Sequence, residues 1–413
     1  MRSSLARLLS FLLMLAPAAC AGAAATQAPA PAVVPGVEVA LGDSLALLRG
    51  KRVGLITNPS GRDRHGNSTI DLVAHAPGVR LTAIFGPEHG LRGGAQAGET
   101  VASTVDSATG VPIYSLYGAI KAPTPVMLEQ VDVLVYDIQD AGARMYTYPW
   151  TMALAAEAAG RAGKPFVVLD RPVPTRGDRV EGGVLDTAWR SFVGQYPVAT
   201  RYGLTPGELL RYLVGTGLVK AHVSVIPMRG WHRSMWYDET GLPWVNPSPN
   251  LRSLDATLLY PGTVMFEATN VSEGRGTDAP FQLVGAEWLH DAGAIAAALN
   301  ARHIPGVHFD STSRLIEAGQ KFAGRTIPMI HVTVTSRDDV QAVAVGAYML
   351  REIYARHTAE WVWRPDWIER LTGTRRMREA VEHEGGVEAL LPALARESAD
   401  FARATRPYLL YPQ

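Results

Sequence analysis

Five short apolar runs recur along the N-terminal two thirds of the chain and predict β-strands. They are almost continuously apolar and rich in β-branched residues, as strands buried on both faces of a parallel sheet are. Stretches with helical spacing separate several of these runs. The expected strands are Arg52–Thr57, Val79–Phe85, Val131–Ile138, Pro165–Asp170 and His222–Pro227, and the expected helices are Ser68–Ala76, Tyr148–Ala162 and Thr205–Val219.

The start of one helix is marked by a capping box. Thr205 precedes Pro206 and stands three residues before Glu208, so the two polar side chains can satisfy the first backbone amides of the helix. Buried strands that alternate with amphipathic helices predict a doubly wound α/β fold, a parallel sheet with helices on both faces. We expect this Rossmann-like domain over residues 36–276.

The pattern changes in the last third of the chain. Helical spacing dominates there, with one β-rich stretch, which predicts a smaller α+β domain over residues 277–413. We expect this domain to pack over the strand ends of the first and to close a cleft. The expected elements are helices in Val284–Asn300, Asp338–His357 and Arg375–Ala404 and β structure over Thr326–Thr335.

Polar segments of unusual sequence follow four of the expected strands: TNPSG, GPEHG, QDAGARMYTYP and DRPVP. In open α/β sheets, ligands bind beyond the carboxyl ends of the strands. Each segment alone is also reasonable turn chemistry. Four together at one edge of the sheet predict a functional site.

Composition limits the kind of ligand. The chain has 413 residues and is 47% hydrophobic, which is enough for two packed domains. Lys and Arg total 39, as do Asp and Glu, so no basic excess argues for nucleic acid or an anionic membrane surface. An anionic ligand would therefore need locally placed cations.

The N-terminus predicts export. Two arginines precede the apolar run Leu8–Ala19, which is too short to span a bilayer and ends among small residues, as in a signal peptide over residues 1–22. Cys20 is the only cysteine, which excludes an internal disulfide. Its position suits a lipid-modified N-terminus in the periplasm, whereas Pro17, where an aliphatic residue is expected, suits ordinary cleavage. Residues 23–35, rich in Ala and Pro, predict a tether.

Several catalytic signatures are missing from the sequence. It contains no G-x-G-x-x-G after the first strand, no H-E-x-x-H, no paired cysteines and no G-x-S-x-G. We therefore expect neither a nucleotide cofactor nor a metal. His89 is then expected to form hydrogen bonds or to contact substrate rather than to bind a metal ion.

Carboxylates remain as the groups with catalytic chemistry. Glu88 lies in a loop framed by Gly and Pro with an apolar strand behind it, a setting in which desolvation favours the protonated form that a general acid requires. Two carboxylates across a cleft suit glycoside hydrolysis. Asp137 and Asp170 are equally suited to helix capping or to binding loop backbone. The further carboxylates near strand ends or in polar loops are Asp140, Glu267 and Glu273.

The chain resembles a known family over about residues 50 to 413. The motifs that carry the resemblance are GLITNPSG, IFGPEHGLRG, VYDIQDAGARMYTY, VLDRP with VEGG, and ATNVSEGRGTDAPFQLVGAEW. The family, first known as DUF1343, is that of the NamZ-type exo-β-N-acetylmuramidases. The resemblance implies a glycosidase of cell-wall turnover, which removes N-acetylmuramic acid from the non-reducing end of peptidoglycan fragments. It also implies a site between a Rossmann-like and a smaller domain, with Glu88 as the catalytic residue.

The partner of Glu88 is sought among Asp137, Asp140 and Glu273. We favour Asp140, which lies beyond a strand end and two residues before a glycine that lets the backbone turn. N-acetylmuramic acid carries a 2-acetamido group that can itself attack the anomeric carbon. The partner is therefore a nucleophile, a base for water or a group that orients the acetamide, and the sequence leaves these open.

The lactyl carboxylate of N-acetylmuramic acid requires a placed cation. Arg92, Arg144 and Arg275 each lie in a motif, and we expect Arg144 or Arg275 to bind the carboxylate bidentately. One departure from the family is Val173, where we expect Asn, and it puts any polar contact at that position in doubt. The other expected substrate contacts are Asn58, His89, Tyr146, Asp170, Arg171, Asn246 and Asn270.

Aromatic residues offer rings for sugar faces at two places. In each group the same spacing also suits packing in the core or an apolar anchor between helices. The groups are Tyr146, Tyr148 and Trp150, and Trp361, Trp363 and Trp367.

Two other classes of function fit the sequence. An exported two-domain protein could bind muropeptides or sugars without cleaving them, in which case Glu88 should tolerate replacement by Gln. A cell-wall esterase or amidase would need Ser60 or Ser272 within hydrogen-bond reach of His89 or another base.

Overall fold

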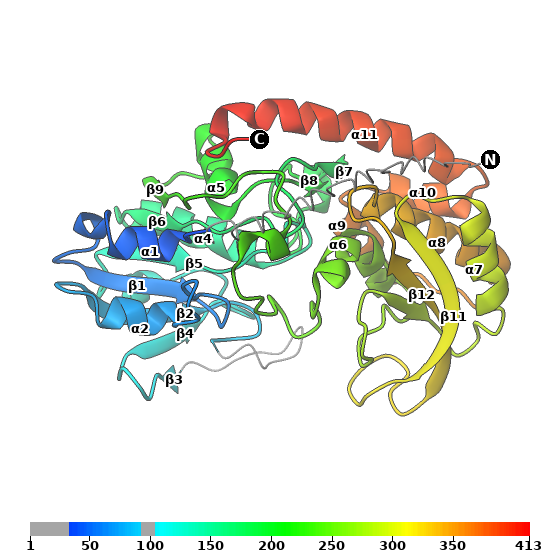
Figure 1. Ribbon diagram of the computed structural model, residues 1–413, viewed down its shortest axis with the longest axis horizontal. Helices are drawn as coiled ribbons and strands as arrows, with labels where there is room; N and C mark the ends of the chain where they lie inside the picture. Colours follow the sequence, from blue (N-terminus) through cyan, green and yellow to red (C-terminus); the bar gives the residue numbers. More distant parts are fainter. Residues whose placement is uncertain (1–32, 92–103) are drawn as a thin grey trace, which may run out of the picture. The chain divides into compact units, whose positions relative to one another are not determined.

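The computed structural model describes residues 33–91 and 104–413, all within one compact unit, Ala32–Gln413 (Figure 1). The expected signal peptide, Cys20 and most of the expected tether lie outside the described residues, as does Arg92. No helix within the described ranges is both long and apolar enough to cross a membrane.

A seven-stranded sheet organises the N-terminal part, in the order β3-β4-β2-β1-β5-β6-β9 (Figure 1). All neighbours pair in parallel except β3, which is antiparallel to β4. The five strands expected from apolar runs are confirmed, whereas β3 and β4 were not expected. The bounds are β1 Arg52–Thr57, β2 Arg80–Gly86, β3 Thr104–Val105, β4 Pro112–Ser115, β5 Val133–Asp137, β6 Phe166–Leu169 and β9 Val223–Ile226.

Helices cover both faces of this sheet, which confirms the doubly wound α/β architecture. Alternate residues of β5 show the division: Val133 and Val135 join the cluster beneath α1 and α2, whereas Leu134 and Tyr136 join the large core beneath α4 and α5. The capping box at Thr205 forms as expected, because its hydroxyl accepts from the Glu208 amide. The bounds are α1 Gly36–Leu41, α2 Thr69–Ala74, α4 Tyr148–Arg161 and α5 Pro206–Gly215, with the short α3 Pro125–Leu128.

Strand β1 is the point where the direction of winding changes. The chain proceeds from β1 to β2 and β4 on one side and to β5, β6 and β9 on the other. Loops from β1, β2 and β5 therefore leave the same edge and diverge, which opens a crevice where ligands bind in such sheets. These loops carry the polar motifs TNPSG, GPEHG and QDAGARMYTYP.

The C-terminal part is a smaller α+β arrangement, as expected. Its antiparallel sheet has the order β10-β12-β11 and packs with α7, while α8 packs on α6. The domain boundary at residues 276 and 277 stays a prediction. The bounds are α6 Leu254–Thr263, β10 Leu283–Gly285, α7 Ala292–Ala301, β11 Val307–Leu315, β12 Thr326–Val334, α8 Ala342–Arg356 and α9 Trp367–Thr372.

Two expectations for this part were wrong in detail. The stretch Val284–Asn300 is not one helix, because it begins within β10 and becomes helical only at Ala292. The stretch Arg375–Ala404 is two helices, because Gly385 adopts a left-handed conformation with φ of 71° and interrupts the helix. The helices are α10 Arg376–Glu382 and α11 Gly386–Thr405.

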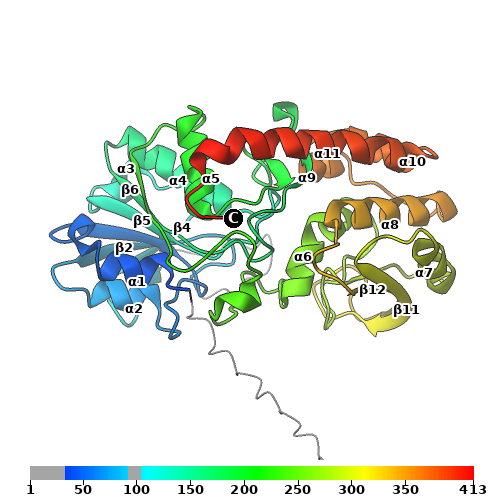
Figure 2. The same cartoon turned by 45° about the horizontal axis from the view of Figure 1, so that its top comes forward.

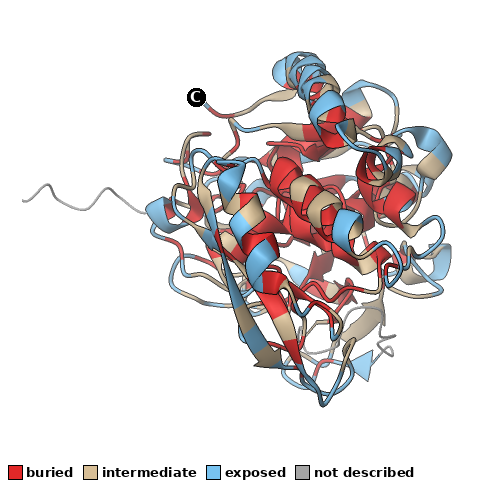
Figure 3. Ribbon diagram, turned by 90° about the vertical axis from the view of Figure 1, so that its right-hand side faces the viewer, coloured by how far each residue is buried: buried red, intermediate tan, exposed pale blue. Residues whose placement is uncertain are grey.

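Helix α11 connects the two parts of the described chain (Figure 2). It buries residues three or four apart, such as Val387, Leu390 and Leu394, and packs on β7 and β8. Figure 3 shows buried residues on the inner side of this helix and exposed residues on its outer side. The remaining elements are β7 Glu181–Val184, β8 Ala199–Arg201 and the 3-10 helices Leu45–Leu47, Thr187–Trp189, Tyr237–Thr240, Val264–Ala268 and Arg406–Tyr408.

Candidate active site

The PEHG motif forms a tight turn directly after β2. The Gly90 amide donates a 2.9 Å hydrogen bond to the Pro87 carbonyl. His89 has a φ of 68°, in the left-handed region that residues other than glycine seldom occupy. Such backbone strain persists where the surroundings impose it, often at functional sites. The turn places Glu88 and His89 together on the wall of one cavity.

Glu88 is held by the start of helix α4. The hydroxyl of Thr147, the residue before that helix, donates a 2.8 Å hydrogen bond to Oε2 of Glu88. The Tyr148 hydroxyl lies 3.4 Å from the Glu88 carbonyl and 3.0 Å from the Pro247 carbonyl. Glu88 is 9% exposed, so its carboxyl group is largely shielded from bulk water but still reaches the cavity.

The cavity has a volume of about 790 Å³ and is lined by loops of the large sheet and by elements of the C-terminal part. This size suits a small-molecule or saccharide site. Among its described lining residues, five cationic side chains face two carboxylates. These charged residues are Lys121, Arg190, Arg275, Arg364 and Arg370, and Glu88 and Glu267. A chain with no net charge thus concentrates positive charge at this place, which favours an anionic ligand.

Three polar atoms on the lining residues have no partner within the described chain. They are Oη of Tyr146, Nε of Arg275 and Nε1 of Trp367, and all three atoms are buried. Buried donors without a partner are rare in native proteins and require an explanation. Because none of the three atoms is accessible to solvent, they belong to the packed wall of the cavity and are not open to a ligand in it.

Glu267 and Arg275 form an ion pair at the cavity. One terminal nitrogen of Arg275 lies 2.5 Å from Glu267, the other lies 2.7 Å from Glu273, and the guanidinium stands 4.9 Å from the Phe281 ring centre. Glu273 also pairs with Lys321 at 3.0 Å. Burial alone would raise the pKa of Glu273, but the two cations outweigh burial and lower it to about 2.

Tyr260 links the two carboxylates of the cavity. Burial raises the pKa of this tyrosine, and the negative charges of Glu267 and Glu88 raise it further. Tyr260 itself lines the cavity.

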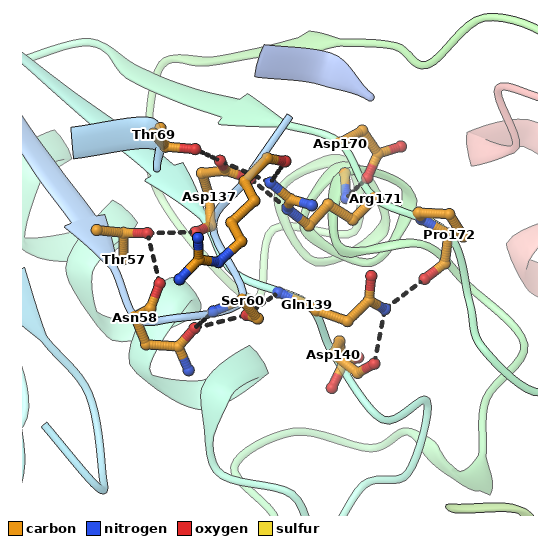
Figure 4. A network of polar contacts seen from close by, with 12 residues as sticks. Thr57, Asn58, Ser60, Thr69, Asp137, Gln139, Asp140, Asp170, Arg171 and Pro172 are labelled. Carbon is orange, nitrogen blue, oxygen red and sulfur yellow. Dashed lines mark hydrogen bonds and ion pairs between the residues drawn. The ribbon is translucent and has the colours of Figure 1, made fainter. Parts of the chain in front are cut away.

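A polar network underlies the strand ends (Figure 4). Asp137 is fully buried at the end of β5 and accepts hydrogen bonds from the Thr69 hydroxyl and from Nε and one terminal nitrogen of Arg171, the latter at 2.8 Å. That same nitrogen of Arg171 donates to the Arg62 carbonyl at 2.7 Å. The pair is satisfied internally and holds the loop after β1 against the loop after β6.

The same network joins the TNPSG, DIQD and DRP motifs (Figure 4). The Gln139 side chain donates to the carbonyls of Asp140 at 2.9 Å and Pro172 at 2.8 Å, and its backbone amide donates to the Ser60 hydroxyl at 2.9 Å. Ser60 in turn donates to the Asn58 side chain at 2.5 Å. The strand-end motifs therefore converge as expected, but the hydrogen bonds of Asn58, Ser60 and Gln139 are made with one another and with nearby backbone.

Asp140 and Asp170 are buried carboxyl groups with raised pKa values. Burial raises the pKa of Asp140 to about 6, although the Tyr202 hydroxyl and nearby amides oppose the shift. Burial likewise raises the pKa of Asp170 to about 7, against hydrogen bonds from Tyr411, the Gly207 amide and the Thr205 hydroxyl. Neither carboxyl group lines the cavity around Glu88.

The family models of the exo-β-N-acetylmuramidase NamZ match most of the chain, the N-terminal model over residues 53–255 and the C-terminal model over residues 258–411. The chain belongs to the NamZ family. A curated relative, the peptidoglycan β-N-acetylmuramidase NamZ of Bacillus subtilis, is 41% identical over 382 residues, which are 92% of this chain and 92% of the relative.

Two crystal structures of DUF1343 family proteins from Bacteroides fragilis share the fold. The first has a TM-score of 0.85 and 36% identity, and the match covers 92% of this chain and 99% of that one. The second has a TM-score of 0.73 and 28% identity, with coverage of 93% and 100%. The likeness therefore extends over both the sheet domain and the C-terminal part.

Four of the residues expected at the site line the cavity: Glu88, His89, Tyr146 and Arg275. Asn58 and Asn246 instead line a neighbouring groove of about 620 Å³, which shares only Ser248 with the cavity among the described residues.

Arg144 requires a correction, because it does not reach the cavity. Its side chain is fully buried, and it donates to the carbonyls of Gly183 at 3.2 Å, Val198 at 3.1 Å and Leu371 at 3.0 Å. Burial lowers its pKa to about 9. Arg144 fastens the β7–β8 region to α9 and is not placed to bind a substrate carboxylate.

Other expected contacts also have structural partners away from the cavity. Asn270 donates to the Glu360 carbonyl at 2.8 Å and accepts from the Val362 amide at 3.0 Å. Val173, the departure from the family, is 2% exposed and packs in the core. The expected residues that lie outside the cavity for such reasons are Asp140, Asp170, Arg171, Asn270 and Glu273.

The aromatic residues divide between core and cavity. Trp150 is fully buried and donates to the Arg144 carbonyl at 2.7 Å, and Tyr148 is also buried in the core. Trp361 and Trp363 pack edge to face, with ring centres 5.1 Å apart, and form an apolar anchor. Trp367 lines the cavity.

The structure gives no support to a serine or metal hydrolase. Within the described residues, neither Ser60 nor Ser272 is hydrogen-bonded to a histidine; Ser60 binds Asn58, and Ser272 accepts from the Gly274 amide. No group of three or more His, Cys, Asp or Glu side chains in these ranges could hold a metal ion.

Sequence reasoning missed several residues of the cavity. Thr147 stands inside a recognisable motif, so its proximity to Glu88 could have been suspected, and Glu267 was named among the carboxylates of the polar loops but not as a partner of Glu88. The cations of the cavity wall stand in no motif, and only the fold brings them together. These are Lys121, Arg190, Arg364 and Arg370.

Proposed function

We propose that this protein is an exo-acting β-N-acetylmuramidase that releases N-acetylmuramic acid from the non-reducing end of peptidoglycan fragments. One observation carries the proposal: Glu88 is fixed by Thr147 on the wall of a cationic cavity of about 790 Å³. Membership of the NamZ family supports the same activity.

Glu88 acts as the general acid. As the bond between the anomeric carbon and the leaving oxygen breaks, Glu88 gives a proton to that oxygen. The hydrogen bond from Thr147 to Oε2 orients the carboxyl group before substrate arrives. The sugar that is released occupies the cavity beside Glu88.

Glu267 is the partner carboxylate that the geometry favours over Asp140 and Glu273. It lines the cavity, and a terminal nitrogen of Arg275 lies 2.5 Å from its carboxyl group and holds it in place. A carboxylate at this place can orient the 2-acetamido group of the substrate or activate water. Asp140 is buried behind Tyr202, and both oxygens of Glu273 are occupied by cations.

The activity is tested with purified protein on a chromogenic β-N-acetylmuramide and on the matching β-N-acetylglucosaminide. The two substrates differ only in the lactyl acid, so the cavity arginines Arg275, Arg364 and Arg370 predict turnover of the muramide at a kcat/KM at least about tenfold higher. Equal turnover of both, or binding of the muramide without turnover, would contradict the proposed function.

We further propose that the protein is exported to the periplasm. The support is the sequence of residues 1–22, an apolar run that ends among small residues. Lipid modification of Cys20 is part of this proposal. Mass spectrometry of the mature N-terminus after expression of the full chain, with and without Cys20→Ser, would separate a lipidated cysteine from ordinary cleavage or retention.

A further inference from the structure

Four residues at the exposed margin of the cavity form a cluster of two cations and two aromatic rings. We call Tyr117, Lys121, Arg190 and Phe192 the rim cluster; all four line the cavity. Lys121 and Arg190 are exposed, whereas the two rings are half-buried. The ammonium of Lys121 stands 4.8 Å from the centre of the Phe192 ring, and the Tyr117 and Phe192 rings are 6.0 Å apart.

The rim cluster lies beside the loop that carries Glu88. Strand β4, which leads into Tyr117, pairs with the end of β2, and the Leu116 amide donates to the Gly86 carbonyl at 2.8 Å. Glu88 follows Gly86 by two residues. In contrast, Arg364 belongs to the side of the second carboxylate, because it donates to the Glu267 carbonyl at 3.1 Å.

The described residues provide no carboxylate partner for the two cations of the rim cluster. Within the described residues, no carboxylate lies within 4.0 Å of Lys121 or Arg190. Their close contacts are with rings: Lys121 with Phe192, and Arg190 with Tyr196 at 5.8 Å. Such cation–ring contacts hold a charged group in place without consuming its charge.

A general acid faces the leaving group, so residues next to Glu88 meet the part of the glycan that departs. We propose that the rim cluster is a subsite for this leaving part and that it selects a leaving glycan that bears a carboxylate. Phe192 and Tyr117 pack against a sugar ring, and Lys121 and Arg190 bind the carboxylate. This inference rests on the proposed function and specifies its substrate.

Two sources can supply the carboxylate. One is the lactyl group of a second N-acetylmuramic acid farther along the glycan, and the other is a stem peptide attached to that second sugar. A disaccharide of N-acetylmuramic acid and N-acetylglucosamine has neither in its leaving part. Longer glycans are therefore the preferred substrates.

The test compares wild type with the double variant Lys121→Met/Arg190→Met on four substrates. These are the chromogenic muramide, the disaccharide, the tetrasaccharide with a free second lactyl group, and the same tetrasaccharide with a stem peptide on that group. Wild type should prefer a tetrasaccharide over the disaccharide in kcat/KM. The double variant should lose about tenfold of this preference, mainly through KM, with the chromogenic substrate unchanged within twofold.

Salt dependence separates a charge effect from a change of structure. Because rim charges are screened, added NaCl should reduce the preference of wild type for the tetrasaccharide but not that of the double variant. The matched control is Arg375→Met, which removes an arginine 5.2 Å from the Trp189 ring and outside the cavity lining. It should behave as wild type.

The result also identifies the carboxylate. A preference for only the free tetrasaccharide assigns the lactyl group, and a preference for only the peptide-bearing one assigns the stem peptide. If wild type hydrolyses the chromogenic muramide but does not distinguish tetrasaccharide from disaccharide, the rim-cluster proposal fails while the proposed function stands. Equal losses of the double variant on all four substrates would also overturn it.

Discussion

The hydroxyl of Thr147 donates a 2.8 Å hydrogen bond to Oε2 of Glu88. This contact joins the turn after β2 to the start of α4, two segments that leave the sheet on opposite sides of β1. The position and orientation of the acid are therefore set where the winding of the sheet changes direction. This hydrogen bond therefore links the topology of the sheet to the orientation of the proposed acid.

Thr147→Val should lower kcat on the muramide by about 10- to 100-fold with little change in KM. A buried hydrogen bond contributes about 0.5–1.5 kcal/mol, and its loss also frees the carboxyl group to rotate away from the leaving oxygen, which lowers kcat further. Steady-state kinetics and the pH profile of kcat measure the effect. Thr147→Ser keeps the donor and should stay near wild type; an equal loss in both variants would mean that the methyl packing matters and the hydrogen bond does not.

Mutation should distinguish a catalytic role of Glu267 from a structural role of Glu273. We expect Glu267→Gln to lower kcat by about 10²-fold or more, because it removes a carboxylate that lines the cavity. Glu273→Gln should mainly reduce thermal stability, because it weakens the ion pairs with Arg275 and Lys321. Calorimetry beside kinetics tests the pair, and the opposite pattern would assign the catalytic role to Glu273.

Arg144→Met should destabilise the protein without changing its specificity. The substitution removes three hydrogen bonds to buried carbonyls, and we expect the free energy of unfolding to fall by about 3 kcal/mol. The ratio of kcat/KM for muramide and glucosaminide should stay as in wild type. A ratio that falls toward one would instead place Arg144 in contact with the lactyl group.

Asp170 should make stability depend on pH between about 4 and 8. Burial raises its folded-state pKa to about 7, above the unfolded value near 3.9, so the folded state binds the proton more tightly. This contribution is fully present below about pH 4 and is lost as pH rises through 7, up to about 4 kcal/mol. Urea unfolding of wild type and Asp170→Asn across this range should show a smaller loss in the variant; parallel curves would mean that Asp170 titrates normally.

The central strands were predictable because burial on both faces leaves a continuous apolar run, as in Val133–Asp137. Strand β11 gave no such signal: its sequence VHFDSTSRL buries only Phe309, so alternation with exposed polar residues hides it. Strand β4, which only the two-residue β3 separates from the edge of the sheet, is four residues long and only partly buried. Burial therefore explains both outcomes: central strands are buried on both faces and show a continuous apolar run, whereas strands near the margins are partly exposed and do not.

The site was predictable to the extent that it is local in the chain. The turn at Glu88 and the polar loop at Arg275 are contiguous motifs, and both line the cavity. Arg144 stands in an equally good motif, but the sequence does not show that its side chain turns away into the protein. Lys121 and Arg190 lie almost seventy residues apart in the chain and meet only in the fold.

The catalytic role of Glu88 is tested most directly by the variant Glu88→Gln. Turnover of the β-N-acetylmuramide is compared between wild type and this variant, and sugar binding and thermal unfolding are measured on the same samples. The amide keeps the shape of the side chain and its hydrogen bond with Thr147 but cannot donate the proton. We predict a loss of turnover of roughly 10²–10⁴-fold or more with binding and stability retained. Retention of more than about a tenth of wild-type activity would contradict the assignment of Glu88 as the catalytic acid.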